Sequence, residues 1–309
     1  MKKTRNKVTI IGAGMVGSSV AYSLVISNIA QEIALIDKNK KLAESQVMDL
    51  QHSVPFWGYT KIKAGNYRDI RDSKIVVVCC GVSQKPGESR LDLVKRNAEI
   101  IKEVVPKIFK ENREVVVLMV TNPVDVLTHL STKLFPEKKN KIIGSGTILD
   151  SARFRFLLGD YLKINPKSVH AYIVGEHGDS ELALWSTATI GNTSISNFKK
   201  LNSKAKKEIF EQAKSAAYTI IEGKQATYYA IASGVAQIVE TVFFDKRMVL
   251  PISHYIDGEY GIRDLCLSLP VVLGEDGIKE RMQPNISLQE KKLLQESAKK
   301  LKKVIKSVY

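Results

Sequence analysis

The sequence predicts an α/β protein, with a Rossmann-type, doubly wound parallel sheet domain followed by an α+β domain. Over roughly the first 145 residues, runs rich in Val and Ile alternate with segments of helical periodicity. These apolar runs lack the polar alternation of a sheet that faces water, so helices should cover both faces. After Gly146 the alternation gives way to longer helical segments and grouped strands. A chain of 309 residues is long enough to form two closely packed domains.

The expected elements follow from these patterns in chain order, because short apolar runs predict strands and amphipathic runs predict helices. The first part gives strand 7–11, helix 15–27, strand 32–37, helix 41–50, strand 74–80, helix 91–110, strand 115–120, helix 124–133 and strand 141–144. The second part gives helix 147–162, short strands around 169–174, helices 203–222 and 227–243, strand-like runs 248–254, 261–267 and 271–273, and a final helix from residue 288. We place a domain boundary near residue 145, which gives domains 1–145 and 146–309. No low-complexity linker separates them, so they should pack tightly.

The charge of the chain is strongly positive but not concentrated. Lys and Arg number 47 against 32 Asp and Glu, a net charge of +15, which raises the question of nucleic-acid binding. The densest basic run lies on the terminal helix beside an apolar stripe that includes Leu294 and Leu301, as on a solvated helix face. The other basic residues are scattered, so nucleic-acid binding is not supported.

The N-terminal residues and the cysteines indicate the compartment. The first residues enter a strand without a signal segment, and no stretch approaches the ~18 apolar residues of a membrane span. Cys79 and Cys80 are neighbours and Cys266 is isolated, which fits neither a disulfide framework nor a metal-ligand spacing. We therefore expect a cytoplasmic protein with no membrane association and no metal site.

A G-x-G-x-x-G motif, Gly12 to Gly17, falls between the first predicted strand and the first predicted helix. Gly12 permits the tight turn, Gly14 allows the close approach of a pyrophosphate, and Gly17 lets the helix pack on the strand. Asp37 ends the second strand, where a carboxylate can bind the adenosine ribose. Glycines that serve packing alone are the alternative, and they do not explain Asp37. Because Asp37 would repel a 2′-phosphate, NAD is favoured over NADP, although Lys38 is adjacent.

The segment from Gly81 to Arg90 follows a buried strand and precedes a long helix. It therefore lies at the carboxyl end of a strand, where open α/β sheets bind ligands. Two glycines and a proline make it a candidate lid, which would bring Arg90 to a small anion beside the neutral amide of Gln84. Taken alone, a surface turn with a solvated Arg is the better interpretation, and only the other motifs favour a lid.

Asn122 precedes Pro123 at the end of another predicted strand. The proline restricts Asn122 to an extended conformation, so its amide can point into the strand-end crevice. There it could bind both the nicotinamide ribose and a substrate hydroxyl. A simple Asn-Pro turn before a helix is the alternative.

His177 stands between Gly175 and Gly178 in a loop, where it has room for a substrate and can act as acid and base near neutral pH. Asp150 is the candidate carboxylate partner. Arg153 follows one helical turn later and could bind a substrate carboxylate with two hydrogen bonds. A helix-surface salt bridge is the alternative for Asp150 and Arg153. Other histidines lack this setting and are interpreted as structural: His52, His129 and His254.

Together these motifs resemble those of the lactate/malate dehydrogenase family over essentially the whole chain. The matching stretches are Gly12–Gly17, Asp37, the Gln84–Arg90 loop, Thr121-Asn122-Pro123, Asp150 with Arg153, Gly175–Asp179 and Thr227. The resemblance implies that 1–145 is an NAD-binding domain and 146–309 a catalytic and oligomerisation domain. It also implies that His177 exchanges the proton, Asp150 orients it and Arg153 binds the substrate carboxylate. Arg90 would polarise the carbonyl. The remaining substrate contacts would come from Gln84, Asn122 and Thr227.

The same resemblance implies a cofactor site, a substrate and an assembly. The residues expected to contact NAD lie in or near the loops that follow the strands: Gly12, Gly14, Met15, Val16, Gly17, Asp37, Tyr67, Gly81, Val82, Asn97, Thr121, Asn122 and Ser145. The expected reaction interconverts pyruvate and L-lactate in fermentative glycolysis. The expected assembly is a homotetramer.

Gln84 separates two substrates within the family, because malate-specific members carry Arg at this position. Oxaloacetate would bury its second carboxylate against a neutral amide, an unpaired charge with a large desolvation penalty, whereas the methyl group of pyruvate fits. Lys85 is adjacent but should point the other way in an extended loop. Lactate is therefore favoured over malate, and larger 2-hydroxy acids stay open. A non-catalytic, basic Rossmann-like binding protein would lack part of the catalytic set, and no gap is visible.

Arg155 and His170 resemble the positions at which many bacterial L-lactate dehydrogenases bind fructose 1,6-bisphosphate between two subunits. Arg155 projects from a different face of its helix than Arg153, and His170 precedes the catalytic loop. A cation and a protonatable imidazole suit a phosphate group. We therefore expect the bisphosphate to activate the enzyme. The alternative is that Arg155 pairs with a carboxylate and His170 is structural.

Overall fold

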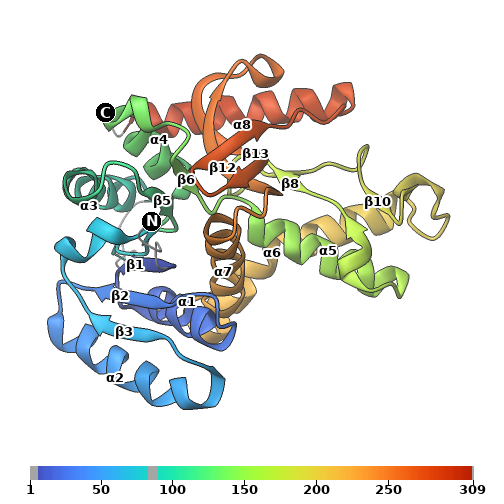
Figure 1. Ribbon diagram of the computed structural model, residues 1–309. Helices are drawn as coiled ribbons and strands as arrows, with labels where there is room; N and C mark the ends of the chain where they lie inside the picture. The colour runs from blue at the N-terminus through green and yellow to red at the C-terminus, as the bar shows by residue number, and fades with distance from the viewer. Residues whose placement is uncertain (1–5, 83–89, 308–309) are drawn as a thin grey trace.

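The computed structural model describes residues 6–82 and 90–307. Its main feature is a mixed sheet with the strand order β14-β13-β12-β6-β5-β4-β1-β2-β3 (Figure 1). Six of these strands are parallel and have the dinucleotide-binding order 3-2-1-4-5-6, which confirms the predicted doubly wound fold. The parallel strands are β1 (Lys7–Ile11), β2 (Glu32–Ile36), β3 (Lys61–Ala64), β4 (Ile75–Val78), β5 (Val116–Met119) and β6 (Ile142–Gly144).

Helices cover both faces of the parallel strands. Alternate strand residues point to opposite faces, and on both faces most of these residues are apolar and pack against helices. Val8 and Ile10 pack with helices on one face, whereas Ile11 packs with helices on the other. The first face is covered by α1 (Met15–Ile26), α2 (Lys40–Trp57) and α7 (Tyr229–Phe243). The second is covered by α3 (Arg90–Glu111) and α4 (Val124–Leu134). A helix from the second half of the chain, α7, thus shares a core with α1 and α2.

Three antiparallel strands extend the sheet beyond β6: β12 (Met248–Asp257), β13 (Arg263–Gly274) and β14 (Gly277–Arg281). The two parts of the sheet meet where Ser253 of β12 pairs with Gly144 of β6. The prediction of separate strand-like runs at 261–267 and 271–273 was wrong, because β13 continues through Pro270. Pro270 lies opposite Pro251 in the ladder, at a position that tolerates the missing N–H groups.

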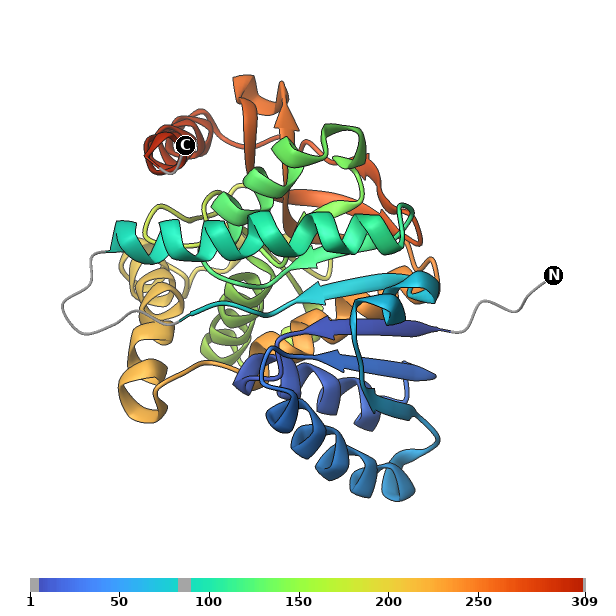
Figure 2. The same ribbon diagram turned by 90° about the vertical axis from the view of Figure 1, so that its left-hand side faces the viewer.

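The rest of the second half surrounds these strands (Figures 1 and 2). It contains the helices α5 (Ile148–Leu162), α6 (Ser203–Lys224) and α8 (Leu288–Lys306). Two small sheets accompany them: β7 (Val169–His170) with β10 (Thr189–Ile190) and β11 (Thr193–Ser194), and β8 (Ile173–Val174) with β9 (Leu182–Ala183). One apolar cluster joins α8 to β12 and β13, and another joins α5 to α6. Across the described ranges, no helix has both the length and the apolar character to cross a bilayer.

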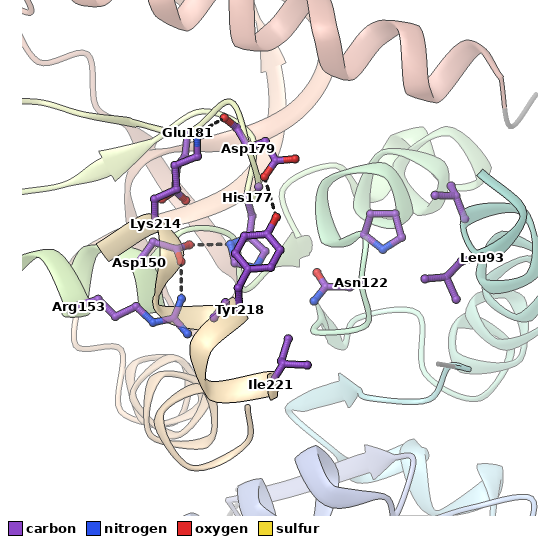
Figure 3. A pocket seen from close by; sticks show the side chains of 14 residues that line it. Leu93, Asn122, Asp150, Arg153, His177, Asp179, Glu181, Lys214, Tyr218 and Ile221 are labelled. Atoms are coloured by element: carbon purple, nitrogen blue, oxygen red, sulfur yellow. Dashed lines mark hydrogen bonds and ion pairs between the residues drawn. The ribbon is translucent and has the colours of Figure 1, made fainter. Parts of the chain in front are cut away.

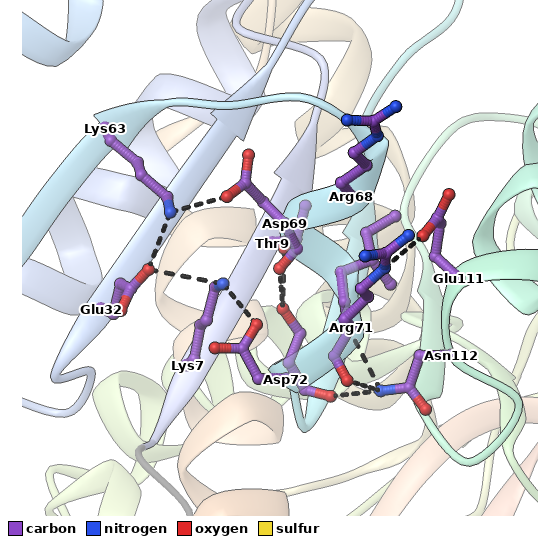
Figure 4. A network of polar contacts seen from close by, with 12 residues as sticks. Lys7, Thr9, Glu32, Lys63, Arg68, Asp69, Arg71, Asp72, Glu111 and Asn112 are labelled. Atoms are coloured by element: carbon purple, nitrogen blue, oxygen red, sulfur yellow. Dashed lines mark hydrogen bonds and ion pairs between the residues drawn. The ribbon is translucent and has the colours of Figure 1, made fainter.

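Charged side chains bond at the amino ends of the strands, opposite the expected site (Figure 4). The buried Lys7 ammonium lies 2.7 Å from Asp72 and 3.4 Å from Glu32. Lys63 lies 2.6 Å from Asp69 and 3.2 Å from the same Glu32. These ion pairs join β1, β2 and β3 to the segment that follows β3.

Candidate active site

The glycine-rich turn after β1 has the geometry that the motif predicts. Gly12 has φ +108°, and a Cβ there would lie 2.7 Å from the backbone of Cys79. A Cβ on Gly17 would lie 1.8 Å from the Gly12 carbonyl oxygen, so the helix can approach the strand only with glycine at this position. Gly14 faces open space, since a Cβ there would meet no atom within 4 Å. The turn therefore fits a pyrophosphate at the start of α1.

Asp37 lies directly beside this turn. Its Oδ2 accepts a hydrogen bond of 2.8 Å from the Ala13 N–H, and its Oδ1 accepts one of 2.8 Å from the Asn39 N–H. The carboxylate is thereby held at the end of β2 next to the glycines. This placement fits the predicted contact with the adenosine ribose.

The other residues predicted to bind the cofactor occupy the same end of the sheet in different environments. Val16, Asn122 and Ser145 line a hollow that also contains Arg153, His177 and Thr227. Asn97 is 2% exposed, and its amide bonds to Val82 and to the Asn122 carbonyl, so it holds two strand-end loops together. The others lie nearby: Thr121 is buried, Tyr67 is half-buried, and Met15, Gly81 and Val82 reach the surface in part or whole. Their contacts with NAD stay a prediction.

His177 and Asp150 form a close pair. The ring Nδ1 of His177 lies 2.6 Å from Oδ2 of Asp150, which leaves Nε2 as the ring atom that can reach a substrate. Burial opposes the charge on His177, but the Asp150 carboxylate outweighs it and raises the pKa of His177 to about 9. Burial also acts against a charge on Asp150, yet the positive ring holds the pKa of that carboxyl below its usual value. The pair thus stores a proton at neutral pH.

Arg153 binds the same carboxylate from one helical turn away in α5. Its Nη1 donates to Oδ1 of Asp150 at 3.0 Å. The side chains of Arg153 and Asp150 are only 12% and 4% exposed, so this is no helix-surface salt bridge. Both line one cavity of about 240 Å³ with His177 and Asn122, and Figure 3 shows Asn122 across the cavity from Arg153. That volume suits a small organic acid.

Sequence reasoning missed Asp125, which supports the catalytic loop. It lies in the first turn of α4, and its Oδ2 accepts a hydrogen bond of 2.7 Å from the backbone N–H of His177. Complete burial raises the pKa of Asp125 to about 6. A carboxylate within the apolar stretch after Pro123 was the available signal, but only the fold brings it beneath His177.

Sequence reasoning also missed the contribution of α6. Lys214 donates to the Asp179 carbonyl oxygen at 2.7 Å, and the Tyr218 hydroxyl donates to the Asp179 carboxylate at 2.8 Å. These bonds join α6 to the loop that carries His177 (Figure 3). Thr227 follows α6 and lines the adjoining hollow, but it precedes α7, so the predicted helix start at 227 was two residues early.

Glu181 is a third unexpected group at the site. Each of Asp150, His177 and Glu181 has a carboxylate oxygen or ring nitrogen that could bind a metal, and these atoms all lie within 4.8 Å of one another. Such a spacing alone could suit a cation, but Arg153 already places a positive charge on Asp150, and we assign no metal there. The predicted absence of a metal stays a prediction.

The predicted lid falls largely outside the described residues. Gln84 lies in the segment 83–89, and of Arg90 the structure describes only its place as the first residue of α3. Their roles stay predictions.

Arg155 and His170 lie away from the pocket, on α5 and β7. The Arg155 Nε donates to the Ser151 carbonyl oxygen at 3.2 Å, and burial lowers the pKa of Arg155. Within 6–82 and 90–307, no carboxylate forms an ion pair with Arg155. His170 is exposed, and Phe156, next to Arg155 in the sequence, is 61% exposed.

Comparisons with known proteins agree with this geometry. Residues 6–144 match the lactate/malate dehydrogenase, NAD binding domain, and residues 147–309 match the alpha/beta C-terminal domain of the same family. The L-lactate dehydrogenase of a Thermoanaerobacter species is 46% identical over 98% of this chain and 99% of its own. That of Acetivibrio thermocellus is 44% identical over 99% and 98%. A crystal structure of the minor L-lactate dehydrogenase from Enterococcus mundtii has a TM-score of 0.97 at 37% identity and covers 99% of both chains.

These matches extend over both halves of the sequence and include the strand order and the stretches that carry the site. The N-terminal match is to an NAD-binding domain and so identifies NAD as the cofactor. The chain belongs to the lactate/malate dehydrogenase family.

Proposed function

We propose that this protein is an NAD-dependent L-lactate dehydrogenase that interconverts pyruvate and L-lactate. One observation carries the proposal: His177, Asp150 and Arg153 place a stored proton and a cation in one small cavity. That cavity adjoins the hollow lined by Val16 and Ser145, where the nicotinamide is expected. The relatives that bear the name L-lactate dehydrogenase support the same assignment.

Each group has a defined task in the reduction of pyruvate. Arg153 binds the carboxylate of the substrate, which sets the position of its carbonyl group. His177 gives its proton to the carbonyl oxygen as an alkoxide develops, and Asp150 stabilises the ring while it is charged. When NADH is bound, it supplies the hydride. Because the pKa of His177 is raised to about 9, the ring is charged at neutral pH, as the reductive direction requires.

The remaining contacts come from the loops around the cavity. We assign Asn122 and Thr227 to the substrate and the nicotinamide ribose, since both line the hollow next to His177. Arg90 would polarise the carbonyl from the start of α3, and Gln84 would face the substrate methyl group. These two assignments rest on the sequence.

NADH oxidation measured side by side with pyruvate, oxaloacetate and 2-oxoisocaproate tests the function. We expect the highest kcat/KM with pyruvate. A preference for oxaloacetate would transfer the assignment to malate, and no oxidation with any of the three would remove it.

We further propose a homotetramer that fructose 1,6-bisphosphate activates, at work in cytoplasmic fermentative glycolysis. Apolar side chains on α2 support association, because Met48 is 58% and Phe56 81% exposed. Phe156 offers a second exposed apolar position near Arg155. The two family matches support domains 1–145 and 146–309.

A further inference from the structure

The proposed reaction uses Asp150, His177 and Arg153 but leaves one carboxyl in the cavity without a task. Glu181 lies four residues after His177 and lines the same cavity (Figure 3). The residue is 8% exposed, and its Oε1 is buried without a hydrogen-bond partner among the described residues. A carboxylate oxygen of Glu181 lies within 4.8 Å of a carboxylate oxygen of Asp150 and of a ring nitrogen of His177. A buried carboxylate without hydrogen bonds is costly, so this group needs an explanation.

Two effects disfavour a negative charge on Glu181. Burial removes the carboxyl from water, and the Asp150 carboxylate repels a second anion; together they raise the pKa of Glu181 to about 8. Three cations act in the opposite direction: His177 from the same loop, Arg153 from α5 and Lys214 from α6. Glu181 is therefore uncharged at neutral pH and ionises in the alkaline range.

We propose, on the basis of the lactate dehydrogenase function above, that Glu181 is a positioning residue that extends the pH range over which His177 holds its proton. As the solution becomes alkaline, the Glu181 carboxyl loses its proton to the solvent. The carboxylate then lies beside the His177 ring and favours its charged form. No proton passes between the two side chains, because the coupling acts through their charges.

The first test compares Glu181→Gln with wild type in kcat/KM for pyruvate across the neutral and alkaline range. Glutamine matches the uncharged carboxyl in shape but cannot ionise. We expect the alkaline decline of kcat/KM to move to lower pH, because the variant lacks the negative charge that favours the charged ring, so it loses progressively more activity as pH rises. Glu222→Gln is the matched control, since it removes a carboxylate from an exposed position on α6.

A purely structural role would predict another result. It would lower the activity of Glu181→Gln by one factor at every pH, and parallel profiles would therefore overturn the proposal. KM and kcat are measured separately, because a shift in the pKa of the proton donor should change the pH profile of turnover, whereas a structural change would lower both parameters without regard to pH.

The second test needs no turnover and so separates this proposal from the proposed function. Asp125 and Glu181 are the described carboxyls with raised pKa, to about 6 and about 8. Infrared spectra of the wild-type protein should therefore show a protonated-carboxyl band that survives above pH 7 and disappears near pH 8. Lys214→Met removes a facing cation, so the band should persist to higher pH. A band that is absent at pH 7, or that does not respond to Lys214→Met, would refute the proposal even if pyruvate is reduced.

Discussion

At the scale of single residues, the most important quantity is the pKa of the His177 imidazole. Free histidine has a pKa near 6.5, and His177 reaches about 9 because the charge of Asp150 outweighs the burial of the ring. Asp125 fixes the backbone of the same residue from below. Reduction of pyruvate should therefore be steady at neutral pH and decline as the pH rises through the alkaline range.

Replacement of His177 by Asn should abolish pyruvate reduction and leave NADH binding nearly intact. The change removes the proton donor, whereas the glycine turn and Asp37 lie in the other half of the chain. Stopped-flow turnover and NADH fluorescence titration measure the two properties. His52→Asn, on the exposed surface of α2, is the control. Near-normal turnover in the His177 variant would remove this residue from the mechanism.

Replacement of Gln84 by Arg should shift the preference from pyruvate toward oxaloacetate. The added cation would pair with the second carboxylate, which a neutral amide leaves unpaired. The ratio of kcat/KM for the two substrates measures the shift, and Lys85→Arg is the neighbouring control. An unchanged ratio would mean that position 84 does not face the variable group of the substrate.

The sequence alone could identify only some of the residues that form the candidate site. His177 between glycines, Asp150 and Arg153 at helical spacing, and Asp37 after a strand carry their signals locally. Asp125 and Glu181 do not, because their environment is made by distant segments. The residues next to Asp125 and Glu181 in the sequence do not show that these carboxyls are buried. Both carboxyls are removed from water only when distant segments pack around the His177 loop.

At the element scale, strand composition decided what could be predicted. The fully buried strands β1 and β4 consist mainly of Val and Ile, and their predicted positions agree closely with the structure. The strand β3 was missed, because Ile62 is its single buried residue. β14 and the two-residue strands β9, β10 and β11 were missed for a similar reason, since pairing with neighbours defines them, whereas β7 and β8 fall within the predicted strands around 169–174. Helix α2 extends past Pro55 to Trp57, seven residues beyond the prediction.

Buried histidines in these elements should make the fold sensitive to acid. His254 lies inside β12, and burial lowers its pKa to about 4, below an ordinary value of 6.5. The unfolded chain binds a proton between these values and the folded chain does not, so the free energy of unfolding falls as pH falls below 6.5. From pH 7 to 5 this single group should cost about 2 kcal/mol.

Urea unfolding of His254→Leu and wild type at both pH values tests this sign. The variant should lose less stability on acidification, because leucine does not titrate. His52→Leu should behave as wild type does, since His52 is exposed. If the His254 variant and wild type lose equal stability on acidification, His254 is not the origin of the acid sensitivity.

At the scale of the whole molecule, the net charge of +15 opposes the association of identical subunits. Arg155 and Phe156 on α5 supply a cation and an exposed apolar ring, and His170 on β7 supplies an exposed imidazole. A polyanion bound between two copies, such as a sugar bisphosphate, would offset this repulsion. Ligand binding and assembly would then be linked by mass action.

Fructose 1,6-bisphosphate should lower the pyruvate concentration at half-saturation. Arg155→Gln should remove this response and spare the rate at saturating pyruvate. Saturation curves and light scattering, with and without the bisphosphate, follow both effects. Lys167→Gln, a nearby exposed cation, is the control. Superimposable wild-type curves across pH 6 to 8 would refute regulation and leave catalysis unaffected.

The pairing of Gly144 with Ser253 has a consequence for the synthesis of the protein on the ribosome. Strand β6 is interior only because β12 covers its edge, and β12 is translated about a hundred residues later. At ~5–20 residues per second, the ribosome needs roughly 5–20 seconds to supply that cover. During this interval the nascent chain carries six complete parallel strands with an open, apolar edge. Slow codons between these two positions should therefore raise the demand for chaperones, whereas slow codons after β14 should not.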